Sequence, residues 1–267
     1  MYTYKKLITF IDPKNMLGSG SEAYVFSIPE NPTHVLRVAR HLLKFCKIEL
    51  EDYYKHQPLN LLSQKDDFPS KNYGQALWVG HFQYDWRVAL SINKRINGYS
   101  LGNIGRNSRS LLNQLKYLNI LKTLNSLPHK HYINLINDIK LLRDKNYILD
   151  VSENNIIYNP QTKTLHPIDY KKKYHYPDLE TNPEDELKYI LTLASFSYFL
   201  KHMKRKAEAS IYIRNIYKKV DDVLKDNPFN EIFPIKNYYR EKTINLLKMT
   251  NNILKSNNNF NNQNEIN

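Results

Sequence analysis

The sequence has a single cysteine, Cys46, among its 267 residues. One thiol cannot form an internal disulfide, and it excludes zinc sites built from several cysteines. A reducing compartment is therefore the natural environment of the chain. No run of about 18 apolar residues occurs, so the sequence predicts no transmembrane segment. The first residues also lack a signal-peptide pattern, which favours a cytoplasmic protein or one secreted without a cleavable signal.

Acidic residues are in the minority, with 26 Asp and Glu against 39 Lys and Arg and a formal net charge of +13. Such an excess attracts polyanions, among them nucleotides, nucleic acid, anionic lipid and acidic proteins. The basic residues are spread along the chain, with short clusters at 171–173 and 201–206. A nucleic-acid-binding protein should concentrate its charge on one face. We therefore expect a generally basic surface and no nucleic-acid partner.

Apolar residues make up 41% of the chain, including 21 Tyr and 10 Phe, which is enough for a folded core. Up to about residue 97 the pattern is rich in β-branched and aromatic residues. It predicts one helix at 41–56 and strands at 5–11, 22–28, 33–39, 76–84 and 86–96.

After residue 97 the spacing of apolar residues becomes helical. It predicts helices at 108–127, 130–143, 184–204, 207–225 and 237–255, with short strands at 147–150, 156–158 and 164–168. We therefore predict an α+β protein with a β-rich lobe at 1–97 and a mainly helical lobe at 98–255. The Asn-rich end, 256–267, is predicted to be disordered.

With only 7 glycines in the chain, a pair close together is informative. Gly18 and Gly20 stand in the segment Leu-Gly-Ser-Gly-Ser-Glu-Ala-Tyr-Val, between two predicted strands. Two such glycines let the backbone approach phosphate oxygens without a Cβ in the way. The spacing is of the kinase type G-x-G-x-x-G-x-V, and the residues that would line the phosphates are Gly18, Ser19, Gly20, Ser21, Ala23 and Val25. An ordinary hairpin turn would have the same local pattern.

A second motif begins at Asp150 and reads Asp-Val-Ser-Glu-Asn-Asn before an apolar strand. A carboxylate followed five positions later by an amide is the catalytic-loop pattern of kinases. The carboxylate orients the attacking hydroxyl, and the amide oxygen binds a metal ion that bridges the phosphates. The spacing selects Asn155 over Asn154 as that ligand. A polar turn is the alternative interpretation of the segment taken alone.

Asp169 completes the set, because it follows the predicted hairpin and lies 14 residues after Asn155. From Met16 to Asp169 the chain resembles the protein-kinase superfamily. The resemblance implies ATP and Mg²⁺ as cofactors, Asp150 as the catalytic base, and Asn155 and Asp169 as metal ligands. The segment 92–101, ending Gly-Tyr-Ser-Leu, is similar to the one that links the two lobes and holds the adenine.

The chain departs from that family in several places. Ile148 replaces the usual His, and Asp169 is followed by Tyr170 and Lys171 in place of Phe-Gly. No Ala-Pro-Glu motif follows, and about 15 residues before the next predicted helix leave no room for a standard activation segment. In this the chain resembles the shortened NleH/OspG-type effector kinases, virulence proteins that pathogenic bacteria inject into host cells.

On the third predicted strand, Arg37 occupies the place of the phosphate-pairing Lys, although Arg40 fits a different register. Alternation places Arg37 on the face opposite its apolar neighbours, which favours it. Arginine keeps the charge but not the geometry of lysine. Its carboxylate partner on the following helix would be Glu49, with Glu51 as the alternative; solvated helix charges are the simpler interpretation of both.

These features predict a protein kinase that transfers the γ-phosphate of ATP to Ser or Thr of a protein, for an effector a host protein. Arg37 leaves open whether it works with arginine, is silenced, or is a pseudokinase that binds a partner. A small-molecule kinase of the aminoglycoside or choline type shares the same Asp, Asn and Asp set. The mostly basic residues after Asp169 give little room for its acidic substrate cavity.

Overall fold

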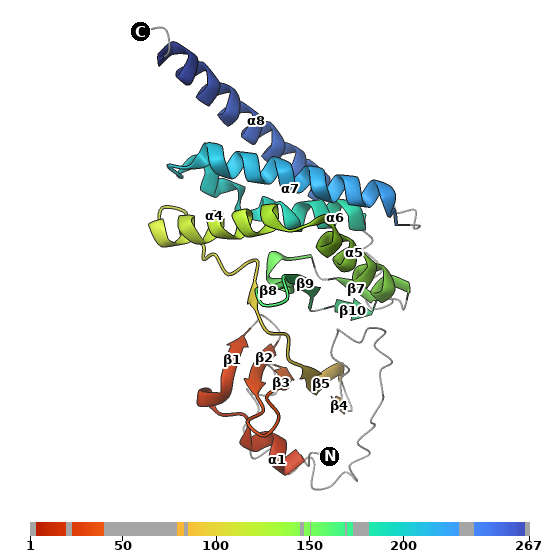
Figure 1. Ribbon diagram of the computed structural model, residues 1–267. Helices are drawn as coiled ribbons and strands as arrows, with labels where there is room; N and C mark the ends of the chain where they lie inside the picture. Colours follow the sequence, from red (N-terminus) through yellow and green to blue (C-terminus); the bar gives the residue numbers. More distant parts are fainter. Residues whose placement is uncertain are drawn as a thin grey trace. The chain divides into compact units, whose positions relative to one another are not determined.

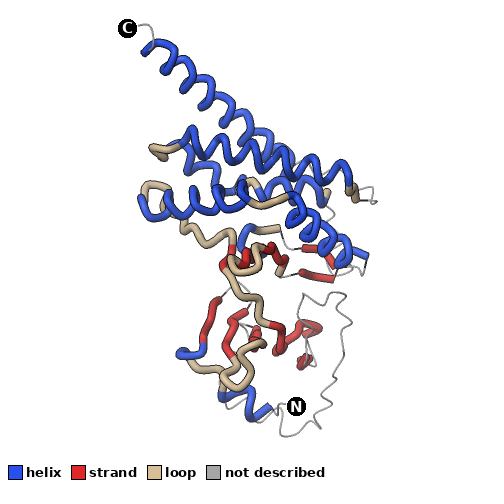
Figure 2. Tube along the Cα trace, in the orientation of Figure 1, coloured by secondary structure: helices blue, strands red, loops and turns tan. Residues whose placement is uncertain are grey.

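The computed structural model describes residues 4–19, 23–39, 79–82, 85–144, 147–149, 151–168, 170–172, 182–229 and 238–264. The chain divides into two compact units, Met1–Ile96 and Asn97–Asn267. It is a mixed α/β protein, with a five-stranded sheet in the first unit and two small sheets among the helices of the second (Figures 1 and 2).

The first unit is built on an antiparallel sheet with the strand order β1-β2-β3-β5-β4. Its strands are β1 (Met16–Ser19), β2 (Ala23–Ser27), β3 (His34–Ala39), β4 (Val79–Phe82) and β5 (Asp85–Lys94). Leu36 and Val38 alternate with half-buried Arg37 on β3, so one face of this strand packs into the core. The strands predicted at 22–28, 33–39 and 86–96 correspond to β2, β3 and β5.

The prediction of a strand at 5–11 is wrong, because residues Tyr4–Thr9 form the helix α1. The prediction rested on β-branched and aromatic content. Among the residues here whose burial is described, Leu7 and Phe10 are buried; they are three positions apart and so lie on one side of a helical turn. The helix predicted at 41–56 lies outside the described residues.

The second unit is mainly helical. Its helices are α4 (Leu111–Ser126), α5 (His129–Asp144), α6 (Pro183–Leu191), α7 (Lys206–Asp226) and α8 (Tyr238–Asn264), with a 3₁₀ segment, η5 (Ala194–Lys201), after α6. They share one hydrophobic core, in which Tyr117, Tyr132 and Phe199 are fully buried. The helix predicted at 184–204 is divided in two, since Leu193 adopts a left-handed backbone with φ 54°.

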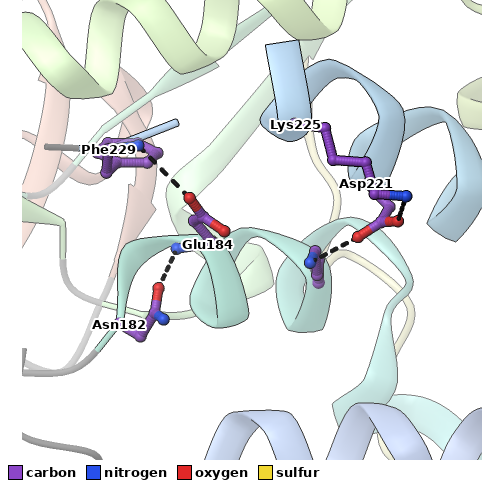
Figure 3. Close-up of polar contacts among 6 residues, drawn as sticks. Asn182, Glu184, Asp221, Lys225 and Phe229 are labelled. Atoms are coloured by element: carbon purple, nitrogen blue, oxygen red, sulfur yellow. Dashed lines mark hydrogen bonds and ion pairs between the residues drawn. The ribbon is translucent and has the colours of Figure 1, made fainter. Parts of the chain in front are cut away.

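The N-terminus of α6 is held by polar contacts shown in Figure 3. Asn182 caps the helix, its side-chain oxygen accepting a hydrogen bond from the Glu184 backbone N–H at 2.9 Å. The Glu184 carboxylate accepts from the backbone N–H of Phe229, which follows α7. Asp221 of α7 pairs with Lys188 of α6 at 2.8 Å and with Lys225 at 2.7 Å. These contacts fix α6 against α7.

The last helix extends further than the composition predicts. Disorder is expected from residue 256, whereas α8 runs to Asn264 and projects beyond the other helices in Figure 1. Asparagine is a poor helix former, but neither Gly nor Pro occurs in α8 to end it. Thr243, Leu246 and Thr250 anchor its first half in the core. Once the helix has formed there, each further residue can join it at little cost in free energy.

Two small sheets lie among the helices of the second unit. One has the order β6-β8-β9 and the other pairs β10 with β7. The strands are β6 (Tyr99–Ser100), β7 (Tyr147–Leu149), β8 (Ile156–Asn159), β9 (Thr164–Pro167) and β10 (Tyr170–Lys172). A 3₁₀ turn, η2 (Glu153–Asn155), precedes β8. The strands predicted at 147–150, 156–158 and 164–168 thus correspond to β7, β8 and β9.

Candidate functional site

The predicted catalytic loop of the second unit ends in the short turn η2. Ser152 caps this turn, its hydroxyl oxygen accepting from the Asn154 backbone N–H at 3.2 Å. The backbone N–H of Asn155 donates to the Ser152 carbonyl at 3.0 Å. Asn155 is buried, whereas its neighbour Asn154 is exposed. The structure thus distinguishes the two adjacent amides, and Asn155 is the one enclosed by protein.

Backbone pairing brings the two ends of the hairpin β8–β9 together. Ile156 pairs with Pro167, and the Ile168 N–H donates to the Asn155 carbonyl at 2.7 Å. Leu149 of β7 pairs in turn with Tyr170 of β10. The predicted residues Asp150 and Asp169 lie outside the described residues, but their sequence neighbours Leu149, Ile168 and Tyr170 do not. The residue before Asp150 therefore pairs with the residue after Asp169, and the residue before Asp169 is bonded to Asn155.

The strand β6 supports this hairpin through an unusually close backbone approach. Tyr99 pairs with Tyr158 of β8, and their rings make an edge-to-face contact with centroids 5.5 Å apart. Gly98 precedes β6 with φ +142°, and a Cβ there would lie 2.1 Å from the Tyr158 carbonyl oxygen. A Cβ at Gly102, after the strand, would lie 2.3 Å from the Asn154 side-chain oxygen. Glycine is required at Gly98 by both conformation and space.

Glu153 is a residue of the site that sequence reasoning did not select. Its side chain is buried, and its carboxylate accepts hydrogen bonds from the hydroxyl of Ser195 at 2.6 Å and from the Ser195 backbone N–H at 3.3 Å. Its carbonyl accepts from the backbone N–H of Gly102 at 3.0 Å. Glu153 therefore ties the loop to η5 and to the segment after β6. In the sequence it has the pattern of an ordinary acidic residue in a helical first turn.

The surroundings of Glu153 include the buried rings of Tyr117 and Phe199. Burial raises the pKa of Glu153, and the hydrogen bonds from Ser195 act in the opposite direction. The pKa of the Tyr117 hydroxyl is also raised, first by burial and then by the nearby Glu153 carboxylate. Tyr117 stacks on Phe199 with ring centroids 5.3 Å apart. The base of the loop is thus a packed, low-dielectric region, which holds η2 in one position.

In the first unit, the structure places part of the predicted phosphate loop. Gly18 and Ser19 end β1, while Ala23 and Val25 belong to β2; Gly20 and Ser21 lie outside the described residues. Gly18 pairs with Val25. A Cβ added at Gly18 would meet no described atom within 4 Å. Packing within the described part of the chain therefore does not demand glycine at this position.

Arg37 lies on β3, the strand that pairs with β2. It faces Val25 across that pair and Ser91 of β5 on the other side. Its side chain is half-buried, while Leu36 and Val38 on either side are buried, so Arg37 points to the opposite face, as the alternation predicts. Glu49, its predicted partner, lies outside the described residues.

A metal site cannot be built from carboxylates and imidazoles of the described residues. No three His, Cys, Asp or Glu side chains gather closely enough there to hold an ion. The predicted ligand set is of another kind, since it joins the amide of Asn155 to Asp169, which is not described. An amide and a carboxylate oxygen together with phosphate oxygens are ligands suited to Mg²⁺.

No family model and no curated protein matches this chain. Among solved structures, it is similar to one described as a co-crystal of WbdD with the kinase inhibitor LY294002, at 11% sequence identity and a TM-score of 0.36. The match covers 78% of this chain and 44% of that chain. The likeness is weak, and the chain spans less than half the length of the protein it matches.

Proposed function

We propose that this protein is an ATP- and magnesium-dependent phosphotransferase, with Ser or Thr of a protein as acceptor. Asp150 would take the proton of the acceptor hydroxyl as its oxygen attacks the γ-phosphorus. The bond from that phosphorus to the bridging oxygen would break, and ADP would leave. Asn155 and Asp169 would hold magnesium, so catalysis would come from positioning and charge stabilisation.

The proposal is carried by one observation in the second unit. The hydrogen bond from the Ile168 N–H to the Asn155 carbonyl joins the two ends of the β8–β9 hairpin. Leu149 pairs with Tyr170 beyond them. The segments that bear Asp150, Asn155 and Asp169 are therefore tied to one another by backbone contacts.

The first unit supports the proposal independently. A kinase positions its phosphate-binding cation on the third strand of the sheet, next to the strand that follows the glycine loop. Arg37 occupies β3, paired with β2 after the glycine turn. No described atom lies within 4 Å of a Cβ built at Gly18, so a phosphate group of a ligand would have room to contact the backbone there. Arginine can contact phosphate through two parallel N–H groups, so its charge suits the role even though its shape differs from that of lysine.

The experiment is transfer of phosphate from γ-labelled ATP with Mg²⁺, to the chain itself and to dephosphorylated casein. Asn155→Ala should lower the rate at least about 100-fold. Loss of a residue that only supports a metal ligand costs up to about 100-fold, and loss of the ligand itself should cost no less. Asn154→Ala is the matched control, since it deletes the same amide one residue away on the exposed side of η2. Its rate should stay within about threefold of the parent chain, because no role in metal binding is assigned to it.

Arg37→Lys and Asp169→Ala complete the series. Transfer by the parent chain that is lost in Asp169→Ala would mean that the enzyme works with arginine. Transfer by Arg37→Lys alone would mean that the parent chain is a silenced kinase. If no variant transfers phosphate and Mg²⁺ with ATP does not raise the Tm, the proposal is wrong, and a scaffold that binds a partner would replace it.

A further inference from the structure

The first two turns of α4 expose three large apolar side chains to solvent. The exposed fractions of Leu111, Leu112 and Leu115 are 66%, 63% and 44%. These positions fall on one side of the helix, opposite the side on which Tyr117 and Leu121 are buried in the core. Adjacent exposed leucines of this size on a folded domain mark a surface that binds something.

Basic residues occur on two loops that Gln114 joins to this end of α4. Gln114 of α4 donates a hydrogen bond to the Ser108 carbonyl at 2.8 Å and makes a longer contact to the His202 carbonyl at 3.4 Å. The first loop carries exposed Arg106 and Arg109, and the second carries exposed Lys204. The leucine–basic surface consists of Arg106, Arg109, Leu111, Leu112, Leu115 and Lys204.

Carboxylates are absent from the two chain segments that carry this surface. The sequence has no Asp or Glu between Asp85 and Asp138, a stretch that includes the first loop and all of α4. The second loop, residues 202–205, contains no Asp or Glu either. Glu208, the first carboxylate after it, pairs with Arg205 at 2.5 Å. The cations of the surface therefore add to one another, and they favour a partner with negative charge.

We infer that the leucine–basic surface docks on the anionic face of a lipid bilayer. Leucine side chains can enter the boundary between headgroups and acyl chains, while long Arg and Lys side chains reach the headgroup phosphates. An interface with a protein is favoured less, because such interfaces are enriched in aromatic residues and depleted in Lys. The six residues are Leu, Arg and Lys; half-buried Tyr198, whose hydroxyl donates to the Arg106 carbonyl at 3.5 Å, is an aromatic side chain next to them and also suits the headgroup boundary.

Binding of this kind would be peripheral. No helix within the described ranges has the length and apolar character to cross a bilayer. A few leucines with a few cations give reversible attachment. Each Lys or Arg close to an anionic membrane adds a similar amount to the free energy of binding. The leucines supply apolar contact, and the cations select anionic lipid. Attachment should therefore require both and weaken as salt is raised.

The test is sedimentation of the full chain with vesicles of phosphatidylcholine, alone or with about 30% phosphatidylserine. We expect binding to the anionic vesicles alone. Arg106→Glu with Lys204→Glu should weaken it about 30-fold or more, and Leu111→Ser with Leu112→Ser about tenfold. Matched controls on α8 are Lys248→Glu with Lys255→Glu, and Tyr238→Ser with Ile244→Ser, all at exposed positions. Both controls should bind like the parent chain.

Several outcomes would overturn the inference. Equal loss in the α8 controls would show general attraction of a basic protein to negative charge. Unchanged binding after the leucine substitutions would show that no side chain enters the bilayer. Retention by immobilised polyglutamate as strong as by anionic vesicles, dependent on the same residues, would assign the surface to an acidic protein. Since no nucleotide is involved, these results are independent of phosphate transfer.

Discussion

Replacing Gly98 by alanine tests how β6 supports the candidate site. The new Cβ would lie 2.1 Å from the Tyr158 carbonyl oxygen, 2.8 Å from its carbonyl carbon and 2.9 Å from Cγ2 of Ile157. Real Cβ atoms do not approach backbone so closely, so β6 must move away from β8. In addition, φ +142° is a conformation that alanine adopts only with strain.

The magnitude follows from these two terms. Overpacking of this kind costs about 1–3 kcal/mol, and a residue forced into a glycine conformation costs about 1–3 kcal/mol. We therefore expect Gly98→Ala to lower the free energy of unfolding of the second unit by about 4 kcal/mol, the middle of the combined range of about 2–6 kcal/mol. That is a large part of the stability of an ordinary domain.

Two other glycines provide graded controls. Gly105 has φ +82°, but its Cβ would meet the Asn113 side chain, which can move. Gly105→Ala should therefore cost about 1–3 kcal/mol, the strain term alone. Gly18→Ala has open space and should cost about 0 kcal/mol within 0.5. It should still weaken ATP binding, if the glycine turn approaches phosphate.

Chemical denaturation with two probes separates the units. Far-UV circular dichroism follows the second unit, because α4, α5, α6, α7 and α8 belong to it. Tryptophan fluorescence follows the first unit, since both tryptophans, Trp78 and Trp86, lie there. Gly98→Ala should lower the denaturation midpoint seen by circular dichroism and leave the midpoint seen by tryptophan fluorescence unchanged. The reasoning is refuted if Gly98→Ala costs no more than Gly105→Ala.

Two further predictions concern buried groups of the second unit. Burial raises the pKa of Glu186 to about 8, against 4.5 ordinarily, so the folded state binds more protons between these values. The free energy of unfolding should then fall as the pH rises from about 5 to about 8, and the fall should vanish in Glu186→Gln, which removes the titrating group. Denaturation at pH 5, 6.5 and 8 measures this; no fall over that range would instead mean that nearby Arg143 keeps Glu186 ionised. The Tyr117 hydroxyl is buried and has no hydrogen-bond partner among the described residues. Tyr117→Phe should therefore leave thermal stability unchanged or raise it by up to about 1 kcal/mol, and a loss above about 1 kcal/mol would show that the hydroxyl is bonded.

Sequence periodicity predicts the helical part of the fold well. The helices expected at 108–127 and 207–225 are α4 and α7, because their apolar residues recur at helical spacing over several turns. The strand expected at 5–11 fails because a six-residue segment is too short for composition to separate strand from helix. The break at Leu193 has no sequence signal either, since it depends on a left-handed residue that is not glycine.

Part of the candidate site is also visible in the sequence, and part is not. The motif spacing predicts that Asn155 stands at the start of a hairpin, and the structure places it in η2 immediately before β8. Glu153 could not be identified in this way. Its role depends on Ser195, 42 residues further along the chain, and such long-range contacts leave no local pattern. Which proposed ligands bind metal stays a prediction.

The β8–β9 hairpin also decides where the chain can change length. Exposed residues 160–163 connect the strands, and neither Ile156–Pro167 pairing nor the Ile168 hydrogen bond depends on them. Insertions there should leave both ends of the hairpin in place. One extra residue inside β8 or β9 would shift the register and turn every following side chain to the other face. Distant relatives should therefore be sought with a variable gap at this turn and fixed spacing on either side of it.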